Sequence, residues 1–244
     1  MPNVYAKWTA PPNICALTTK RTSGFSQGSF NSNNFGLHVD DNPAHVSANR
    51  SSLVDTLKLP STPQWLEQTH STLPVIIEED TNRKADAAIT RDPDVVLAIM
   101  TADCQPILLC NKQGTEIAAI HAGWRGLLNG VVENTIAKMN SSPSDILAWI
   151  GPAICPSCFE VGEEVREMYV KQYPFAINYF KSKGEKWLAN LPLITEKILQ
   201  NLSVSNVFQS HMCTYEQNND FYSYRREQQT GRMASLIWFN NNRD

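Results

Sequence analysis

The stretch Val95–Cys110, VVLAIMTADCQPILLC, decides how the rest of the chain is interpreted. Apolar residues run to Met100, the polar cluster Thr101-Ala102-Asp103-Cys104 interrupts them, and a second apolar run follows. Short apolar runs of this kind predict two buried strands, over 95–100 and 105–111. An acid and a thiol between two core strands leave two interpretations. Either Cys104 packs as a small hydrophobe, or the interruption carries the chemistry of the protein.

The segments around this stretch predict an α+β fold. Helical spacing covers 44–57 and 126–139, and 159–173 and 186–202 are further helix candidates. Strands are predicted at 64–70, 73–79, 117–120, 146–154, 205–210, 221–227 and 232–239, and the polar stretch 22–34 reads as a loop. Strands and helices mix without a strict βαβ order, so we expect packed mixed β-sheets flanked by helices, in one domain over 1–244.

Composition narrows the class of protein. The 244 residues are 42% hydrophobic, with a net charge of −3 and a pI near 6.0. No basic surface is therefore expected for nucleic acid or an anionic membrane, and the partner should be a small molecule. The N-terminus lacks the features of a signal peptide, and no apolar run reaches the ~20 residues of a membrane span. We expect a cytoplasmic protein with six reduced cysteines, as a monomer or weak dimer.

Two histidines and one cysteine stand where apolar segments give way to turns. His70 ends QWLEQTH, His121 ends the apolar run of EIAAIH, and Cys104 follows VVLAIM. Two imidazoles and one thiolate suit Zn²⁺ with a fourth position left for water, and the soft thiolate would also accept copper. Alternatively, Cys104 is a nucleophile, a histidine is its base, and Asp103 orients an imidazole or a substrate donor. The spacing also allows that all three only pack or form structural hydrogen bonds.

Two further motifs have a functional and a structural interpretation. Cys155-Pro-Ser-Cys158 is a lone C-x-x-C, which needs a second pair or a thioredoxin-like context to become a metal or redox site. We therefore assign it no function from the sequence. In HAGWRGLLNG (121–130), Gly123 and Gly126 permit a tight turn into a helix. The N-terminus of that helix and Arg125 would hold a phosphate, or the glycines only allow close packing.

At these motifs the sequence resembles the YfiH/PgeF family. The resemblance is carried by TADCQPILLC, AAIHAGWRGLLNGVVENT, ILAWIGPAI followed by FEVGEEV, and FYSYRREQQTGRMASLIW. It extends from RTSGFSQGSFNSNNFGLHVDDNP near the start to LIWF, so it covers nearly the whole chain. Members of this family are described as purine nucleoside phosphorylases, laccase-type polyphenol oxidases or peptidoglycan editing factors. The resemblance also implies a single α+β domain, similar in fold to a bacterial toxin deamidase with a Cys-His site.

The resemblance implies which residues form the site. The metal ligands would fall on His70, Cys104 and His121, with zinc as the usual occupant and copper proposed for the oxidase activity. These three and Asp103 are the expected catalytic residues, and Asp103 or a free histidine would handle protons. The positions that match polar residues around the family cleft, and so are expected to bind substrate, are Arg21, Asn34, Arg125 and Arg225. One departure is that Thr22-Ser23-Gly24 stands where the family often has Gly-Gly, which changes the first loop.

The expected activity is that of a zinc-dependent purine nucleoside enzyme. The resemblance implies phosphorolysis of adenosine, inosine, guanosine and methylthioadenosine, and deamination of adenosine, with nucleoside and phosphate as partners. One alternative is a cysteine hydrolase or amidase that edits peptidoglycan precursors through Cys104. Another is a copper-dependent polyphenol oxidase, although one His/Cys/His set offers too few ligands for a multi-copper cluster. A non-enzymatic binding module would leave the three converging ligands unexplained.

Overall fold

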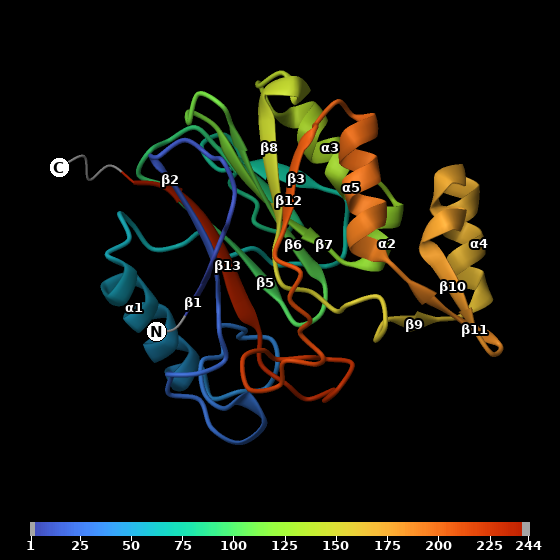
Figure 1. The fold of residues 1–244 in the computed structure, drawn as a ribbon. Helices are drawn as coiled ribbons and strands as arrows, with labels where there is room; N and C mark the ends of the chain where they lie inside the picture. Colours follow the sequence, from blue (N-terminus) through green and yellow to red (C-terminus); the bar gives the residue numbers. More distant parts are fainter. Residues whose placement is uncertain (1–2, 241–244) are drawn as a thin grey trace.

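The computed structural model describes residues 3–240, and its centre is a pair of packed β-sheets (Figure 1). The first sheet is antiparallel throughout, in the order β1 (Asn3–Tyr5), β2 (Ile14–Thr19), β13 (Met233–Phe239), β5 (Val96–Thr101). The second is mixed, in the order β12 (Asn206–Gln209), β8 (Ile146–Ile150), β6 (Gln105–Asn111), β7 (Ile117–Ala122), β4 (Ala87–Thr90), β3 (Pro74–Ile76). Its two outermost pairs are parallel. A small third sheet joins β10 (Phe180–Lys183), β11 (Lys186–Ala189) and β9 (Glu160–Val161).

Helices cover the outer faces of both large sheets (Figure 1). On the first sheet, Leu53 of α1 (Pro43–Leu57) packs with Val96, Ala98 and Leu236. The second sheet is covered by α2 (Trp124–Leu128), α3 (Val131–Lys138), α4 (Glu163–Gln172) and α5 (Leu191–Asn201). Short 3₁₀ turns lie at Gly28–Phe30, Pro143–Asp145 and Pro174–Tyr179. The predicted α+β fold, with mixed sheets packed together and flanked by helices, is confirmed.

The two strands of the opening stretch are apolar along their whole length because both of their faces are buried. In β5, Leu97 and Ile99 pack between the two sheets, whereas Ala98 faces the α1 side. In β6, Leu108 packs between the sheets and Ile107 faces the layer of α3 to α5. Successive strand residues point to opposite faces, so a strand covered on both sides shows no alternation of polar and apolar residues.

The polar interruption is the place where the chain crosses from one sheet to the other. Strand β5 belongs to the first sheet and β6 to the second, and Ala102–Cys104 form the bend between them. Asp103 has a φ of 91° there, a left-handed conformation that aspartate tolerates better than most residues. The backbone of the bend lies outside the strand ladders of both sheets.

Two predicted strands, 64–70 and 221–227, are not strands. Residues 64–70 form a single bridge, at Gln64, and Gln68 instead uses its side-chain amide to bind the backbone N–H and C=O of Met100. In 221–227, Phe221 and Tyr222 are both buried, but neither belongs to a ladder. This segment forms turns, and Arg226 donates to three carbonyl groups across them.

The predicted helix over 126–139 is broken in two. Gly130 adopts a left-handed φ of 96°, so α2 ends at Leu128 and α3 begins at Val131. The segments 159–173 and 186–202 each open with a short strand, β9 or β11, before their helix. The sequence patterns did not indicate β1, β2, β4 or β10. None of the helices in the described part of the chain is long and apolar enough to cross a membrane.

Candidate metal centre

The three predicted ligands converge on one point. The ligand atoms of His70, Cys104 and His121 all lie within 4.8 Å of one another. The Cys104 Sγ is 3.9 Å from the His70 Nε2, and the two imidazole rings meet edge to face with centroids 4.8 Å apart. His121 lies near the end of β7, Cys104 lies in the bend between the sheets, and His70 lies on a loop. The site therefore depends on the packing of three distant segments.

A buried carboxylate that sequence reasoning missed, Asp86, orients both histidines. Its Oδ1 lies 2.7 Å from the His121 Nδ1 and accepts the backbone N–H of His70 at 3.0 Å. Its Oδ2 accepts from the N–H groups of Thr69 and Ser71 and from the Ser71 hydroxyl. Because Nδ1 of His121 is engaged, Nε2 is the nitrogen left for the site. The signal that the sequence offered was an acidic residue directly before the apolar residues of β4. Asp103 likewise stands next to an apolar strand.

His70 reaches the site from a strained turn. Its φ of 58° lies in the left-handed region, which is uncommon for a residue other than glycine. The three consecutive N–H groups of residues 69–71 all bind Asp86, so one fully buried carboxylate holds the turn in this conformation. Backbone conformations of this kind persist where surrounding contacts enforce them, and they are frequent at functional sites.

Gly123 provides space for the site rather than a special turn. Its φ is −66°, which any residue adopts. A Cβ at this position would lie 2.8 Å from the His70 Cδ2 and 3.0 Å from the Cys104 Sγ. Gly126 likewise lies close to the carbonyl oxygen of Ser71. The glycines of HAGWRG thus allow close approach. Helix α2 contains only five residues, so the expected helix over 126–139 is not there to hold an anion at its N-terminus.

Cys104 and His121 form a thiolate–imidazolium pair. Burial alone raises the pKa of Cys104, but the neighbouring His121 and His70 outweigh it and lower the pKa to about 6. Burial likewise disfavours a charged His121, yet the Cys104 thiolate and Asp86 raise its pKa. The sulfur is therefore anionic near neutral pH, which is the form that binds a metal or attacks an electrophile.

The donor set fits a transition metal. Two imidazole nitrogens and one thiolate are ligands that catalytic zinc sites combine, with one coordination position left open. The buried Asp86 behind His121 is the carboxylate that commonly orients a metal-bound histidine. His70 is exposed and Cys104 is half-buried, so one side of the set faces solvent.

The three ligands lie in a cleft of about 520 Å³, within the usual range for small-molecule sites. Its wall is basic and aromatic: beside the ligands it contains Arg125, Arg225, Arg232, Trp124, Phe159 and Tyr224. The Arg125 guanidinium lies over the Trp124 ring at 4.1 Å from its centroid, and Arg225 lies over Phe159 at 5.3 Å. The cleft thus offers cationic groups beside flat apolar surfaces. Sequence reasoning did not find Arg232, Phe159 or Tyr224.

Asp103 lines the cleft, but both of its oxygens hold the cleft wall. Oδ1 accepts the Thr214 hydroxyl at 2.7 Å. Oδ2 accepts the Ser223 hydroxyl at 3.0 Å and the backbone N–H of Arg225 at 2.7 Å. These bonds fix the turn that carries Arg225 into the cleft, so the geometry favours a positioning role for Asp103 over proton transfer.

Two of the predicted substrate-binding residues, Arg21 and Asn34, do not line this cleft. Arg21 stacks on Tyr222 at 4.7 Å, donates to Asn31 and Asn218, and lines a separate surface pocket. Asn34 is fully buried, and its side-chain oxygen accepts the N–H of Arg232 at 2.8 Å. Asn34 therefore lies behind a cleft residue, whereas Arg125 and Arg225 are in the cleft as expected.

Known proteins with the same fold cover almost the whole chain. A family model described as multi-copper polyphenol oxidoreductase laccase matches residues 15–240. The purine nucleoside phosphorylase YfiH of Escherichia coli (strain K12) is 44% identical over 96% of this chain and 98% of its own. A Haemophilus influenzae purine nucleoside phosphorylase is 43% identical over 98% of this chain and 100% of its own.

Solved structures agree with this match. A Neisseria meningitidis protein superposes with a TM-score of 0.94 at 41% identity, covering 99% of this chain and 100% of its own. YlmD from Geobacillus stearothermophilus superposes with a TM-score of 0.87 at 27% identity, covering 98% of this chain and 100% of its own. The sequence motifs, the fold and these relatives lead to one conclusion: the chain belongs to the YfiH/PgeF family.

Proposed function

We propose that this protein is a zinc-dependent purine nucleoside enzyme, which carries out phosphorolysis of adenosine, inosine, guanosine and methylthioadenosine and deamination of adenosine. The observation that carries the proposal is the convergence of His70, Cys104 and His121 within 4.8 Å in a basic, aromatic cleft. The names of the relatives, purine nucleoside phosphorylases, support the substrate class. Parts of both large sheets and of the loops contribute to the cleft, which supports treating the chain as one catalytic domain.

His70, Cys104 and His121 would hold the zinc ion. When bound, it would supply Lewis-acid chemistry, which activates water for hydrolysis near neutral pH. Asp86 keeps His121 in the tautomer that presents Nε2 to the site. The thiolate of Cys104 provides the negative charge that favours a divalent cation over a neutral occupant.

The cleft wall suits the two substrates of phosphorolysis. Arg125, Arg225 and Arg232 bring three guanidinium groups to one cavity, and guanidinium groups bind phosphate oxygens through paired N–H donors. Trp124, Phe159 and Tyr224 offer flat faces against which a purine ring packs. Holding phosphate beside the ribose supplies the proximity that a displacement between two bound reactants needs.

The proposal is tested with purified protein, zinc analysis and chromatography of adenosine incubations. With phosphate, adenine and a ribose phosphate should form. Without phosphate, inosine should form. Cys104→Ala should lose zinc from this site and lose both products, whereas Cys15→Ala, a change in β2 outside the cleft, should retain them. Full activity of Cys104→Ala protein without zinc at this site would overturn the proposal.

A cysteine hydrolase acting on peptidoglycan precursors is the second candidate, and a specific observation favours it. The ligand atoms of Cys104 and His121 lie within 4.8 Å of each other, and Asp86 orients His121, which resembles the nucleophile, base and carboxylate of cysteine hydrolases. This alternative predicts amidase activity that survives chelation and is lost to iodoacetamide. Chelator-sensitive nucleoside activity, with no amidase activity, would reject it.

Copper-dependent oxidation of phenols is the third candidate. It is supported by the family description and by a thiolate that accepts copper. Loading the metal-free protein with Cu²⁺ and measuring oxygen uptake with a phenol tests it directly. A lack of uptake above that of the Cys104→Ala variant would reject it.

A further inference from the structure

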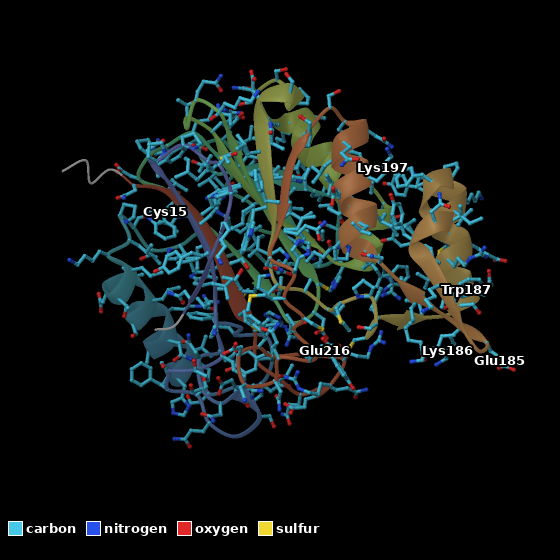
Figure 2. All side chains as sticks on the ribbon, viewed as in Figure 1. Cys15, Glu185, Lys186, Trp187, Lys197 and Glu216 are labelled. Carbon is cyan, nitrogen blue, oxygen red and sulfur yellow. The ribbon has the colours of Figure 1, made fainter. Side chains whose placement is uncertain are left out.

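A second group of thiols lies on the turns beside the cleft. Cys155, Cys158 and Cys213 bring their sulfur atoms, and Glu216 a carboxylate oxygen, within 4.8 Å of one another. We propose that these four residues form a second metal site, which binds Zn²⁺ in a structural role. The site is distinct from the His70–Cys104–His121 centre, because it shares no residue with it. Figure 2 labels Glu216 in the lower part of the molecule.

The local backbone brings the first two thiols together. Cys155-Pro-Ser-Cys158 closes a tight turn, in which the N–H of Cys158 donates to the Cys155 carbonyl at 3.0 Å. The N–H of Phe159 donates to the same carbonyl at 3.1 Å. Turns of this kind place both sulfur atoms of a C-x-x-C on one side, as zinc sites require.

Tertiary structure supplies the ligands that the lone C-x-x-C lacked. Ala153 forms a parallel bridge with Cys213, and the N–H of Thr214 donates to the Ala153 carbonyl at 3.0 Å. This pairing delivers Cys213, and Glu216 follows it one turn later. Because the partners come from a segment more than fifty residues downstream, spacing within the motif could not reveal them.

The donor atoms are already near the separation that a metal imposes. Cys158 Sγ lies 3.5 Å from the Glu216 Oε1, and the four donor atoms all lie within 4.8 Å of one another. With Zn–S bonds of about 2.3 Å, ligand atoms of a tetrahedral site lie roughly 3.8 Å apart. Thiols are weak hydrogen-bond donors, so the contacts among these side chains give little reason for three sulfur atoms to converge.

The surroundings suit an anionic ligand set. Three thiolates and a carboxylate exceed the charge of a divalent cation, so fixed positive groups nearby are expected. Arg226 donates to the carbonyls of Thr214 and Tyr215 at 2.9 and 2.8 Å, and Arg225 donates to that of Glu160 at 3.1 Å. Both guanidinium groups are therefore held on backbone carbonyls of the segments that carry the cluster.

The proposed ion would tie together two segments that hold the cleft wall. The N–H of Ile154, next to Cys155, donates to the Asp103 carbonyl at 3.0 Å. Thr214, next to Cys213, donates its hydroxyl to the Asp103 carboxylate at 2.7 Å. A site with four protein ligands keeps no open position for substrate, which is the pattern of structural zinc. Its role would be to fix the bend that carries Cys104.

Metal counting tests the proposal. Protein purified under reducing conditions and loaded with zinc should contain two equivalents by elemental analysis. The double variant Cys155→Ser, Cys158→Ser should keep one, and adding Cys104→Ala should remove the other. A zinc content in the double variant equal to that of the wild type would overturn the proposal. Loss of one zinc equivalent in the single variant Cys104→Ala reports on the centre in the cleft. The zinc content of the two variants therefore tests the two sites independently.

A second measurement does not require the cluster to be mutated. In a Cys104→Ala background, a thiol-modifying mercurial should release one zinc equivalent per chain, detected with a colorimetric chelator. Cys15→Ser is the matched control, since Cys15 lies in a different part of the molecule from Glu216 (Figure 2). No zinc release, or a disulfide among these thiols found by mass spectrometry of the native protein, would overturn the proposal.

Discussion

The two sulfur clusters of this protein are built in different ways. The cleft centre, His70–Cys104–His121, combines two imidazoles with one thiolate, and a buried carboxylate orients its histidines. The turn cluster, Cys155–Cys158–Cys213–Glu216, offers sulfur and carboxylate donors from two loops. The first offers three donors at the wall of a large cleft, whereas the second offers four donors. The comparison suggests that the open set serves a substrate and the closed set serves the fold.

The electrostatic states of the two clusters also differ. Imidazoles beside Cys104 lower its pKa, whereas burial and the neighbouring Cys155 thiol raise the pKa of Cys158. The cleft centre therefore holds a thiolate, whereas Cys158 and Cys213, whose pKa values are raised by burial, must lose protons to bind a cation.

Removing a histidine should have the largest effect. In His121→Ala, we expect kcat/KM on adenosine to fall on the order of 10³-fold, as when one member of a catalytic group is lost. The cleft centre should lose its metal, and the turn cluster should keep its own. Steady-state kinetics and elemental analysis measure both. Loss of both metals together would show that the two clusters are not independent.

Weakening the support behind the ligands should have the next largest effect. Asp86→Asn replaces the carboxylate that orients His121 and holds the His70 turn, and we expect zinc affinity at the cleft centre to fall roughly 10–100-fold. Competition with a fluorescent chelator measures the affinity. Asp55→Asn, an exposed change on α1, is the control. Unchanged zinc affinity in Asp86→Asn would contradict the role assigned to Asp86.

Removal of the metal with a chelator should make the difference in pKa between Cys104 and Cys158 measurable. Only the thiolate reacts with iodoacetamide, so the alkylation rate of each cysteine rises as the pH passes its own pKa. In chelated protein, Cys104 should react increasingly through about pH 6 and be close to its maximum by pH 7.5. Cys158, whose pKa is raised, should react at least about tenfold more slowly at pH 7.5. Peptide mapping at several pH values measures the alkylation of both cysteines. Equal rates for Cys104 and Cys158 at pH 7.5 would contradict the difference in their pKa values.

Opening the turn cluster should have the smallest effect on catalysis. In Cys155→Ser, Cys158→Ser, we expect kcat to fall less than about tenfold and Tm to fall by roughly 5 °C, because loss of a bound ion removes stability from the folded state. Differential scanning calorimetry with and without added zinc measures the change. If added zinc raises the Tm of the double variant as much as that of the wild type, the turn cluster does not bind zinc.

The strands were predictable where a local pattern marks them. Both β5 and β6 were predicted within a residue of their bounds, because strands buried on two faces read as apolar runs. The same reasoning was wrong for 64–70 and 221–227. There, backbone N–H groups bind carboxylates and not a ladder: those of Thr69 and His70 bind Asp86, and that of Arg225 binds Asp103. It also joined α2 and α3, since the helical spacing passes across Gly130.

Sequence alone determined the strand character of VVLAIM and QPILLC, the mixed α+β class and, through family motifs, the order His70, Cys104, His121. These properties depend on local periodicity or on the identity of residues. Only tertiary structure decided that TADC is the crossing between two sheets, that Asp86 orients both histidines, and that Cys213 and Glu216 join the lone C-x-x-C. Each of these joins segments far apart in the chain, and their contacts are set by how the sheets and loops pack.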